Sequence, residues 1–219
     1  MSANATPADI AAAYAIGASI VAVLLVVALH VLEPEFAPSW RMLSEYSLGR
    51  YGVLMRVAFL AGGTSVIAVA VALSGSAWPK SVGLVLVATG PLGAAFVDTD
   101  PVTTPRTQMS RRSNVHAGLG ALFILGFPVA ATVAGVAAAD DPAIGSVLAW
   151  ASLAPWIALT GFLAATIRHA RPDGRGAPEV RIGWPNRVSM LAYLGWVALA
   201  DVPDACVRTD TGTPPKPHA

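Results

Sequence analysis

Charged side chains are scarce in this chain. Asp, Glu, Lys and Arg together make up 12% of its 219 residues, about half the roughly one quarter that soluble globular proteins carry. Hydrophobic residues make up 55%, and the mean hydropathy is +0.61. Few charges combined with long uncharged runs place the chain in the class of integral membrane proteins.

Cysteine and basic residues are also few, and each shortage excludes a class of protein. The single cysteine, Cys206, excludes an intrachain disulfide framework and a cysteine-rich metal site. A net charge of +1 without a basic stripe gives no indication of a nucleic-acid partner. Because no Lys or Arg precedes the first apolar run, we expect no cleaved secretory signal, and the first run should remain as a membrane anchor.

Six apolar runs dominate the sequence. A helix needs about 20 mostly apolar residues to cross about 30 Å of hydrocarbon, and alternating ten-residue segments typical of a β-barrel are absent. We therefore expect one all-α domain, a polytopic membrane bundle of six transmembrane helices over 10–202. An N-terminal tail, 1–9, and a disordered C-terminal tail, 203–219, flank it. The predicted spans are 10–32, 53–73, 81–97, 115–139, 144–167 and 185–202.

Several residues inside the spans predict local features. Gly90-Pro91 should kink the short third span, since proline removes one helical hydrogen bond, and Pro155 lies inside the fifth. Arg56, one turn inside the second span, is expected to extend its charge to the membrane surface. Small residues predict close approach of helix backbones. They occur at 17–19, 62–63, 118 and 120.

The distribution of basic residues predicts the orientation. The face formed by the loops after the first, third and fifth spans carries eleven arginines, and the face with both termini carries three basic residues. Positive residues favour the cytoplasmic side. The arginine-rich face should therefore be cytoplasmic, with both termini outside, in the cell inner (plasma) membrane.

Polar residues that could take part in catalysis or ligand binding also gather on the arginine-rich face. The stretch from Phe96 to His116 lies between two apolar runs and contains two aspartates, three arginines and a histidine. The loop after the first span and the start of the sixth span should reach the same surface. We expect a polar pocket there, built from Glu33, Ser44, Glu45, Asp98, Asp100 and His116.

Several motifs give the chain a family resemblance. The block from Ser44 to Met55 reads S-E-Y-S-L-G-R-Y-G-V-L-M, and Phe96 to Pro101 reads F-V-D-T-D-P. Leu32-Glu33-Pro34-Glu35, His116 at a helix start and Pro185-Asn186-Arg187 follow the same order along the chain. Together, over Tyr14 to Trp196, they resemble the DUF998 family of bacterial six-span membrane proteins of unknown function. Many relatives have proline where Val97 stands. The resemblance implies the fold and the membrane location, and it implies no reaction.

The leading hypothesis is a membrane protein whose cytoplasmic-side pocket binds or processes a lipid-like amphipathic ligand. Polar groups at one mouth of an apolar bundle suit a lipid head group. A hydrolytic version uses His116 as base, oriented by Asp98 or Asp100, with Ser44 or Ser47 as nucleophile or substrate contact. The ligand-binding residues would be Glu33, Glu45, Ser47, Arg50, Asn186 and Arg187.

The same pocket is also compatible with a metal site. His30 and Glu33 are three residues apart at a helix end, and therefore on one face. With Asp100 and His116 they form a nitrogen and oxygen ligand set of the type that zinc accepts. Zinc is the only cofactor that the residue pattern suggests, and its bound water would act as the nucleophile.

Two further functional classes need no reaction. In a structural or regulatory protein the same residues cap helices and form ion pairs, such as Glu45 with Arg50 or Asp98 with Arg187, while Asn186 caps the sixth helix. A small-solute transporter would require ionisable groups near the middle of the spans, and the spans contain almost none. The sequence leaves the oligomeric state open.

Overall fold

The computed structural model describes residues 5–73, 81–138, 145–174 and 176–200, and these parts are helical without a strand. This confirms the all-α fold. Asp140 to Pro142 and the two tails, 1–4 and 201–219, lie outside the described residues. The elements are α1 (Pro7–Leu32), η1 (Leu43–Leu48), α2 (Gly52–Ala72), α3 (Val82–Ala94), η4 (Arg106–Gln108), α4 (Arg111–Ala137), α5 (Gly145–Ala151), α6 (Leu153–Arg168) and α7 (Gly183–Ala200).

Each predicted span coincides with helical structure, and four of them are supported as membrane spans. The segments Pro7–Leu32, Gly52–Ala72, Arg111–Ala137 and Gly145–Arg168 are long and apolar enough to cross a bilayer. The helix Val82–Ala94 is apolar but has only 13 residues. Helix α7 has 18 residues and contains Asn186 and Arg187 in its first turns, which lowers its hydropathy. The chain is thus a helical membrane protein with at least these four candidate spans among its described residues.

The fifth predicted span is interrupted at Ser152, between α5 and α6. Pro155 follows three residues later and has no backbone N–H to donate to the carbonyl one turn earlier, which weakens the helix there. The Ser152 hydroxyl lies 2.9 Å from the carbonyl of Leu148 and 3.1 Å from the carbonyl of Ala131 in α4, and it donates to both. The interruption is therefore held firmly against α4.

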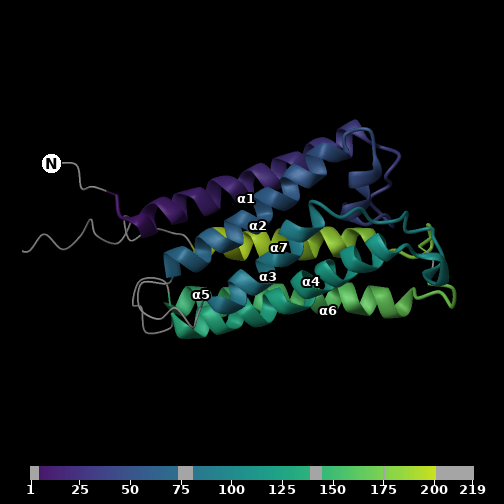
Figure 1. The fold of residues 1–219 in the computed structure, drawn as a ribbon. Coiled ribbons are helices and arrows are strands. Elements are labelled where there is room, and N and C mark those ends of the chain that lie inside the picture. Colours follow the sequence, from purple (N-terminus) through teal and green to yellow (C-terminus); the bar gives the residue numbers. More distant parts are fainter. Residues whose placement is uncertain (1–4, 74–80, 139–144, 175, 201–219) are drawn as a thin grey trace, which may run out of the picture.

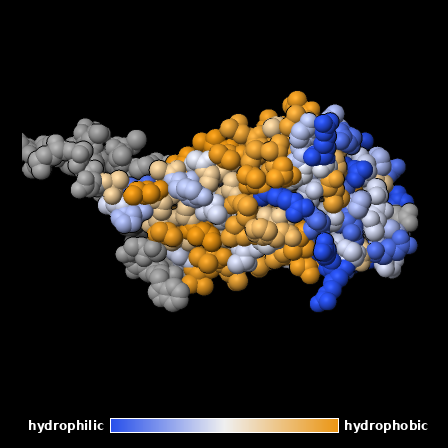
Figure 2. Space-filling model, turned by 45° about the horizontal axis from the view of Figure 1, so that its top comes forward, coloured by the Kyte–Doolittle hydropathy of each residue, from blue (hydrophilic) through white to orange (hydrophobic). Residues whose placement is uncertain are grey.

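The helices lie side by side, and three of the connections between them gather at one end of the bundle (Figure 1). At one end lie three loops, 33–51, 95–110 and 169–182, which connect α1 to α2, α3 to α4 and α6 to α7. We call these loops and the adjoining helix ends the polar end. In the face shown in Figure 2, apolar residues cover most of the helical body and hydrophilic residues gather at the polar end.

Aromatic side chains fill the part of the core farthest from the polar end. The Phe127 ring of α4 stacks on Tyr193 of α7 with ring centroids 4.6 Å apart, and meets Trp196 edge-on. The Tyr193 hydroxyl donates to the carbonyl of Ile124 at 2.7 Å, and the Trp196 indole N–H donates to Ser152 Oγ at 3.0 Å. Both polar tips therefore have partners, as buried Tyr and Trp require.

The small residues do not all have the role expected from the sequence. A Cβ added to Gly63 would come within 2.7 Å of Leu92, so α2 and α3 do approach closely there. At Gly17, Gly118 and Gly120 an added Cβ would meet nothing within 4 Å. Close helix approach is therefore the wrong explanation for these three glycines. Arg56 extends its guanidinium to the loop at the polar end, where it forms an ion pair with Asp98.

The arrangement gives a test of orientation. Ala170 is exposed at the polar end and Ala8 is exposed at the opposite end of α1. In a Cys206→Ser background, a membrane-impermeant thiol reagent added to intact cells should label Ala8→Cys and spare Ala170→Cys, because the arginine-rich face should be cytoplasmic. Labelling of Ala170→Cys alone would reverse the orientation, and labelling of both after cell lysis is the control.

Candidate functional site

Backbone hydrogen bonds join the three loops of the polar end. The N–H of Val102 donates to the Glu45 carboxylate at 2.9 Å, and the Val102 carbonyl accepts from Gly176 N–H at 2.7 Å. Gly183 N–H, at the start of α7, donates to the Ser39 carbonyl at 3.2 Å. Three connections that are far apart in sequence therefore form one layer across the end of the bundle.

Glu45 is the acceptor that organises the first loop. Its carboxylate is buried and accepts from the Arg41 guanidinium at 2.6 Å and from Met42 N–H at 3.0 Å. The second contact caps the first turn of η1. Its cationic partner is thus Arg41 and not Arg50, which is exposed and lies over the Tyr51 ring at 5.5 Å. Glu45 fixes the loop and does not face a cavity.

Arg187 crosses from α7 to α1 and is only 4% exposed. Its Nε donates to His30 Nε2 at 2.7 Å, while His30 Nδ1 lies 2.7 Å from the Val26 carbonyl. A carbonyl only accepts, so His30 carries its proton on Nδ1 and Nε2 is the acceptor. The Arg187 Nη1 donates to the carbonyl of Arg41 at 2.7 Å. His30 therefore uses both ring nitrogens within the protein.

Tyr46 closes this cluster from η1. Its ring lies 5.3 Å from both His30 and Phe36, measured between centroids. Its hydroxyl donates to the Phe36 carbonyl at 3.4 Å and accepts from Arg187 at 3.5 Å. Burial raises the pKa of the Tyr46 phenol above its ordinary value. The hydroxyl thus stays protonated and keeps its donor. Nearby, the Ser47 hydroxyl donates to the Ser44 carbonyl at 2.7 Å.

The two aspartates of the central loop have separate partners. Asp98 forms an ion pair with Arg56 of α2, in place of Arg187, and Arg56 also donates to the Ala95 carbonyl at 3.4 Å. Asp100 accepts from the backbone N–H of Ser110 at 2.6 Å and from its hydroxyl at 3.0 Å. Ser110 in turn caps α4, so Asp100 supports a helix start.

Glu33 is 1% exposed at the end of α1. One carboxylate oxygen accepts from Tyr51 N–H at 2.6 Å, and the side chain lies directly on Gly49, which has no Cβ to obstruct it. The second oxygen has no hydrogen-bond partner among the described residues. Glu33 thereby joins the end of α1 to the start of α2.

His116 lies in the first turns of α4 and is 6% exposed. Its Nδ1 donates to the Val97 carbonyl at 2.6 Å, and its ring meets Phe59 edge-on at 6.0 Å. A backbone carbonyl therefore orients this imidazole. Among the described residues, neither Asp98 nor Asp100 forms a hydrogen bond with it. In the neutral ring Nε2 is then an acceptor, and it has no partner within that part of the chain.

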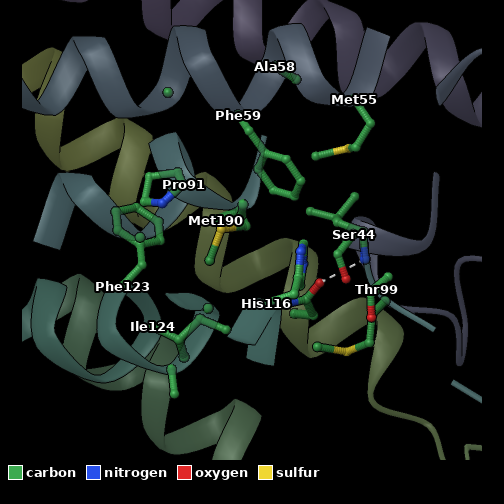
Figure 3. A pocket seen from close by; sticks show the side chains of 18 of the residues that line it. Ser44, Met55, Ala58, Phe59, Pro91, Thr99, His116, Phe123, Ile124 and Met190 are labelled. Carbon is green, nitrogen blue, oxygen red and sulfur yellow. Dashed lines mark hydrogen bonds between the residues drawn. The ribbon is translucent and has the colours of Figure 1, made fainter. Parts of the chain in front are cut away.

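Beneath the polar end lies a cavity of about 440 Å³, inside the bundle (Figure 3). Its wall is mostly apolar and comes from α1, α2, α3, α4, α6 and α7. Phe59, Pro91, Phe123, Ile124 and Met190 surround it in Figure 3. Cavities of roughly 300–1,000 Å³ with such linings are typical of small-molecule sites.

Four residues with hydrogen-bonding side chains line the cavity: Ser44, Thr99, His116 and Asn186. The Asn186 carbonyl oxygen accepts from Leu43 N–H at 3.1 Å, so this side chain braces η1 and does not cap its own helix. Its amide NH₂ has no protein acceptor within the described residues. The residues lining the cavity include no Asp, Glu, Lys or Arg.

Only some of the residues predicted for the site therefore line the cavity. Ser44, His116 and Asn186 line it, whereas the other predicted residues do not: the carboxylates, Ser47, Arg50, His30 and Arg187. Sequence reasoning missed Thr99 and the apolar wall. Thr99 stands between the two aspartates of the central motif, and its hydroxyl donates to the Asp100 carbonyl at 3.1 Å. Its position between the two aspartates was the only feature of the sequence that could have indicated Thr99 as a lining residue.

The four residues considered as metal ligands form hydrogen bonds with different partners. His30 is bound to Val26 and Arg187, Glu33 to Tyr51, Asp100 to Ser110, and His116 to Val97. Within the described parts of the chain, no three His, Cys, Asp or Glu side chains are grouped as metal ligands. Zinc stays a prediction, to be checked by metal analysis.

We infer that the cavity opens between α4 and α6, because the most exposed residues of its lining lie on these two helices. Leu125 and Leu163, which line it, are 47% and 37% exposed, and Ala117 and Ala121 are exposed as well. All four lie within segments that are apolar enough to span a membrane. This opening therefore faces the side of the helical bundle and not the polar end.

The first loop and α7 are in contact through Gly183, and this contact is testable. A Cβ at Gly183 would lie 2.3 Å from the Pro38 carbonyl oxygen and 2.8 Å from Trp40 N, both backbone atoms. We expect Gly183→Ala to destabilise the detergent-solubilised protein by about 1–3 kcal/mol, as overpacking does. Thermal unfolding followed by size-exclusion chromatography measures the change.

Gly195→Ala is the matched control on the same helix. An added Cβ there meets nothing within 4 Å, so the melting temperature should stay or rise slightly, because Ala favours helix by about 1 kcal/mol over Gly. Equal melting temperatures for Gly183→Ala and wild type would show that the loop does not pack on α7 as described.

Comparison with known proteins identifies a family without an assigned activity. No curated protein and no solved structure matches the chain. The model of one family, described as a protein of unknown function (DUF998), matches residues 16–202. This range includes every helix from α2 to α7, about two thirds of α1, and each residue that lines the cavity. The chain belongs to the DUF998 family.

Proposed function

We propose that this protein binds an amphipathic, lipid-like molecule in the cavity beneath its polar end. The observation that carries the proposal is the division of the cavity wall. Most of the lining is apolar, and the four polar side chains are Ser44, Thr99, His116 and Asn186. A molecule with a hydrocarbon part and a small polar head would satisfy both kinds of surface.

The lateral opening supports the same function. An apolar molecule concentrates in the bilayer, and the gap between α4 and α6 is lined by Leu125 and Leu163 within candidate spans. Such a ligand could enter along apolar surface without exposing its hydrocarbon part to water. A polar solute would have to cross the same apolar mouth, which argues against a small-solute transporter.

Binding is better supported than hydrolysis. In a Ser–His hydrolase a third group usually orients the base, most often a carboxylate. Here the His116 Nδ1 is held by the Val97 carbonyl, and both aspartates are engaged elsewhere. The network of Arg187, Glu45 and Glu33 above the cavity forms its roof, which agrees with a structural role for those residues. We assign them to stability and the cavity to ligand binding.

Occupation of the cavity can be tested by filling it. Gly62 lines the cavity, and a Cβ added there would lie 3.9 Å from its nearest neighbour, the side chain of Leu194. The variant Gly62→Leu should therefore fold and place its side chain in the cavity. The protein in phosphatidylcholine nanodiscs is incubated with tritiated oleamide, oleyl alcohol or oleyl sulfate, and binding is read by scintillation proximity. At least one compound should bind saturably to wild type, and Gly62→Leu should weaken it at least about tenfold.

Gly195→Leu is the control, because Gly195 is exposed, does not line the cavity and has space around it. Its binding should equal that of wild type. If no compound binds saturably, or if both leucine variants bind like wild type, the cavity is not the ligand site. Release of oleic acid from oleamide that depends on Ser44 and His116 would establish hydrolysis instead of simple binding.

A further inference from the structure

The hydrogen-bonding groups that line the cavity restrict the head group of its ligand. Some of these side chains have hydrogen-bond acceptors or donors that no group of the described protein uses. The inference rests on the proposed function, since it describes the ligand of the same cavity.

His116 supplies an acceptor. Its Nδ1 is committed as a donor, because the Val97 carbonyl at 2.6 Å can only accept. The neutral ring therefore presents the lone pair of Nε2, which has no partner among the described residues. His116 lines the cavity, so this lone pair is available to a hydrogen-bond donor on a bound molecule.

Asn186 supplies a donor. Its side-chain oxygen accepts from the Leu43 N–H at 3.1 Å, which fixes the orientation of the amide. The NH₂ group is then the free end of the side chain, and it has no acceptor within the described parts of the chain. The Ser44 hydroxyl can donate or accept, whereas the Thr99 hydroxyl, whose proton is donated to the Asp100 carbonyl, adds an acceptor.

The described residues that line the cavity include no charged side chain. Two charged groups of the polar end have partners within the protein, Arg187 with His30 and Glu45 with Arg41. A charged head group would enter an apolar space without a counter-charge, and such burial is strongly unfavourable. A neutral head group that offers both a donor and an acceptor meets no such penalty.

We propose that the ligand has an uncharged head group carrying both an N–H or O–H donor and a carbonyl-type acceptor, such as a primary amide on a hydrocarbon chain. The donor of the head group binds His116 Nε2, and its acceptor binds the Asn186 amide NH₂. The hydrocarbon chain lies along Phe59, Phe123 and Met190. Fatty amides and monoacylglycerols have this chemistry, and phospholipids and quaternary amines do not.

The test compares oleyl compounds that share one hydrocarbon chain. Oleamide is neutral with donor and acceptor, N,N-dimethyloleamide is neutral without a donor, and oleyl sulfate and oleyltrimethylammonium are permanently charged. Cavity binding is taken as binding to wild type minus binding to Gly62→Leu, which removes partition into the nanodisc. Oleamide should bind at least about tenfold more tightly than either charged compound, and more tightly than the dimethyl amide.

Substitution at the acceptor then locates the contact. His116→Phe should reduce the preference for oleamide over N,N-dimethyloleamide to about one, because Nε2 is absent, while His169→Phe outside the cavity should keep the full preference. This ratio is independent of the fraction of folded protein. Stronger binding of a charged compound, or an unchanged ratio in His116→Phe, would overturn the inference. Absence of cavity-dependent binding for every compound would instead reject the proposed function.

Discussion

A buried guanidinium sets the constraint on which the polar end depends. A charge removed from water must be hydrogen-bonded on most of its donors, or the fold loses several kcal/mol. Arg187 meets this condition only if α1, the loop after it, η1 and α7 come together, because its acceptors are His30, the carbonyls of Arg41 and Gly183, and the Tyr46 hydroxyl. Once these four pieces are joined, η1 lies across the bundle and Ser44 and Asn186 are held over its interior.

The charged network and the cavity are two separate layers. Glu45, Glu33 and Asp100 each accept from backbone N–H groups in the loops of the polar end, so their negative charge serves to order connections that have little regular structure of their own. Below them the described cavity lining is mostly apolar, and its polar side chains carry hydroxyl, amide and imidazole groups. This separation keeps charged side chains out of the cavity lining. The neutral polar groups that remain in the lining can distinguish ligands by hydrogen bonding.

The sequence predicted the helices and the convergence of the loops, because hydropathy and proline positions are local properties of the chain. It also predicted Ser44, His116 and Asn186 near one surface. Partner choice could not be predicted, since it depends on how far each side chain reaches across helices: Asp98 pairs with Arg56 and Glu45 with Arg41. Nor could the cavity, because glycines such as Gly62 and Gly120 look the same in sequence whether a neighbouring helix approaches them or leaves space.

The opening between α4 and α6 decides which reservoir the cavity samples. Leu125 and Leu163 place its mouth among acyl chains and not at the aqueous boundary. For a molecule dissolved in the membrane, the rate at which the cavity fills then depends on its mole fraction among the surrounding lipids. A compound of very low water solubility could fill the site rapidly, because the step that limits its transfer through water never occurs.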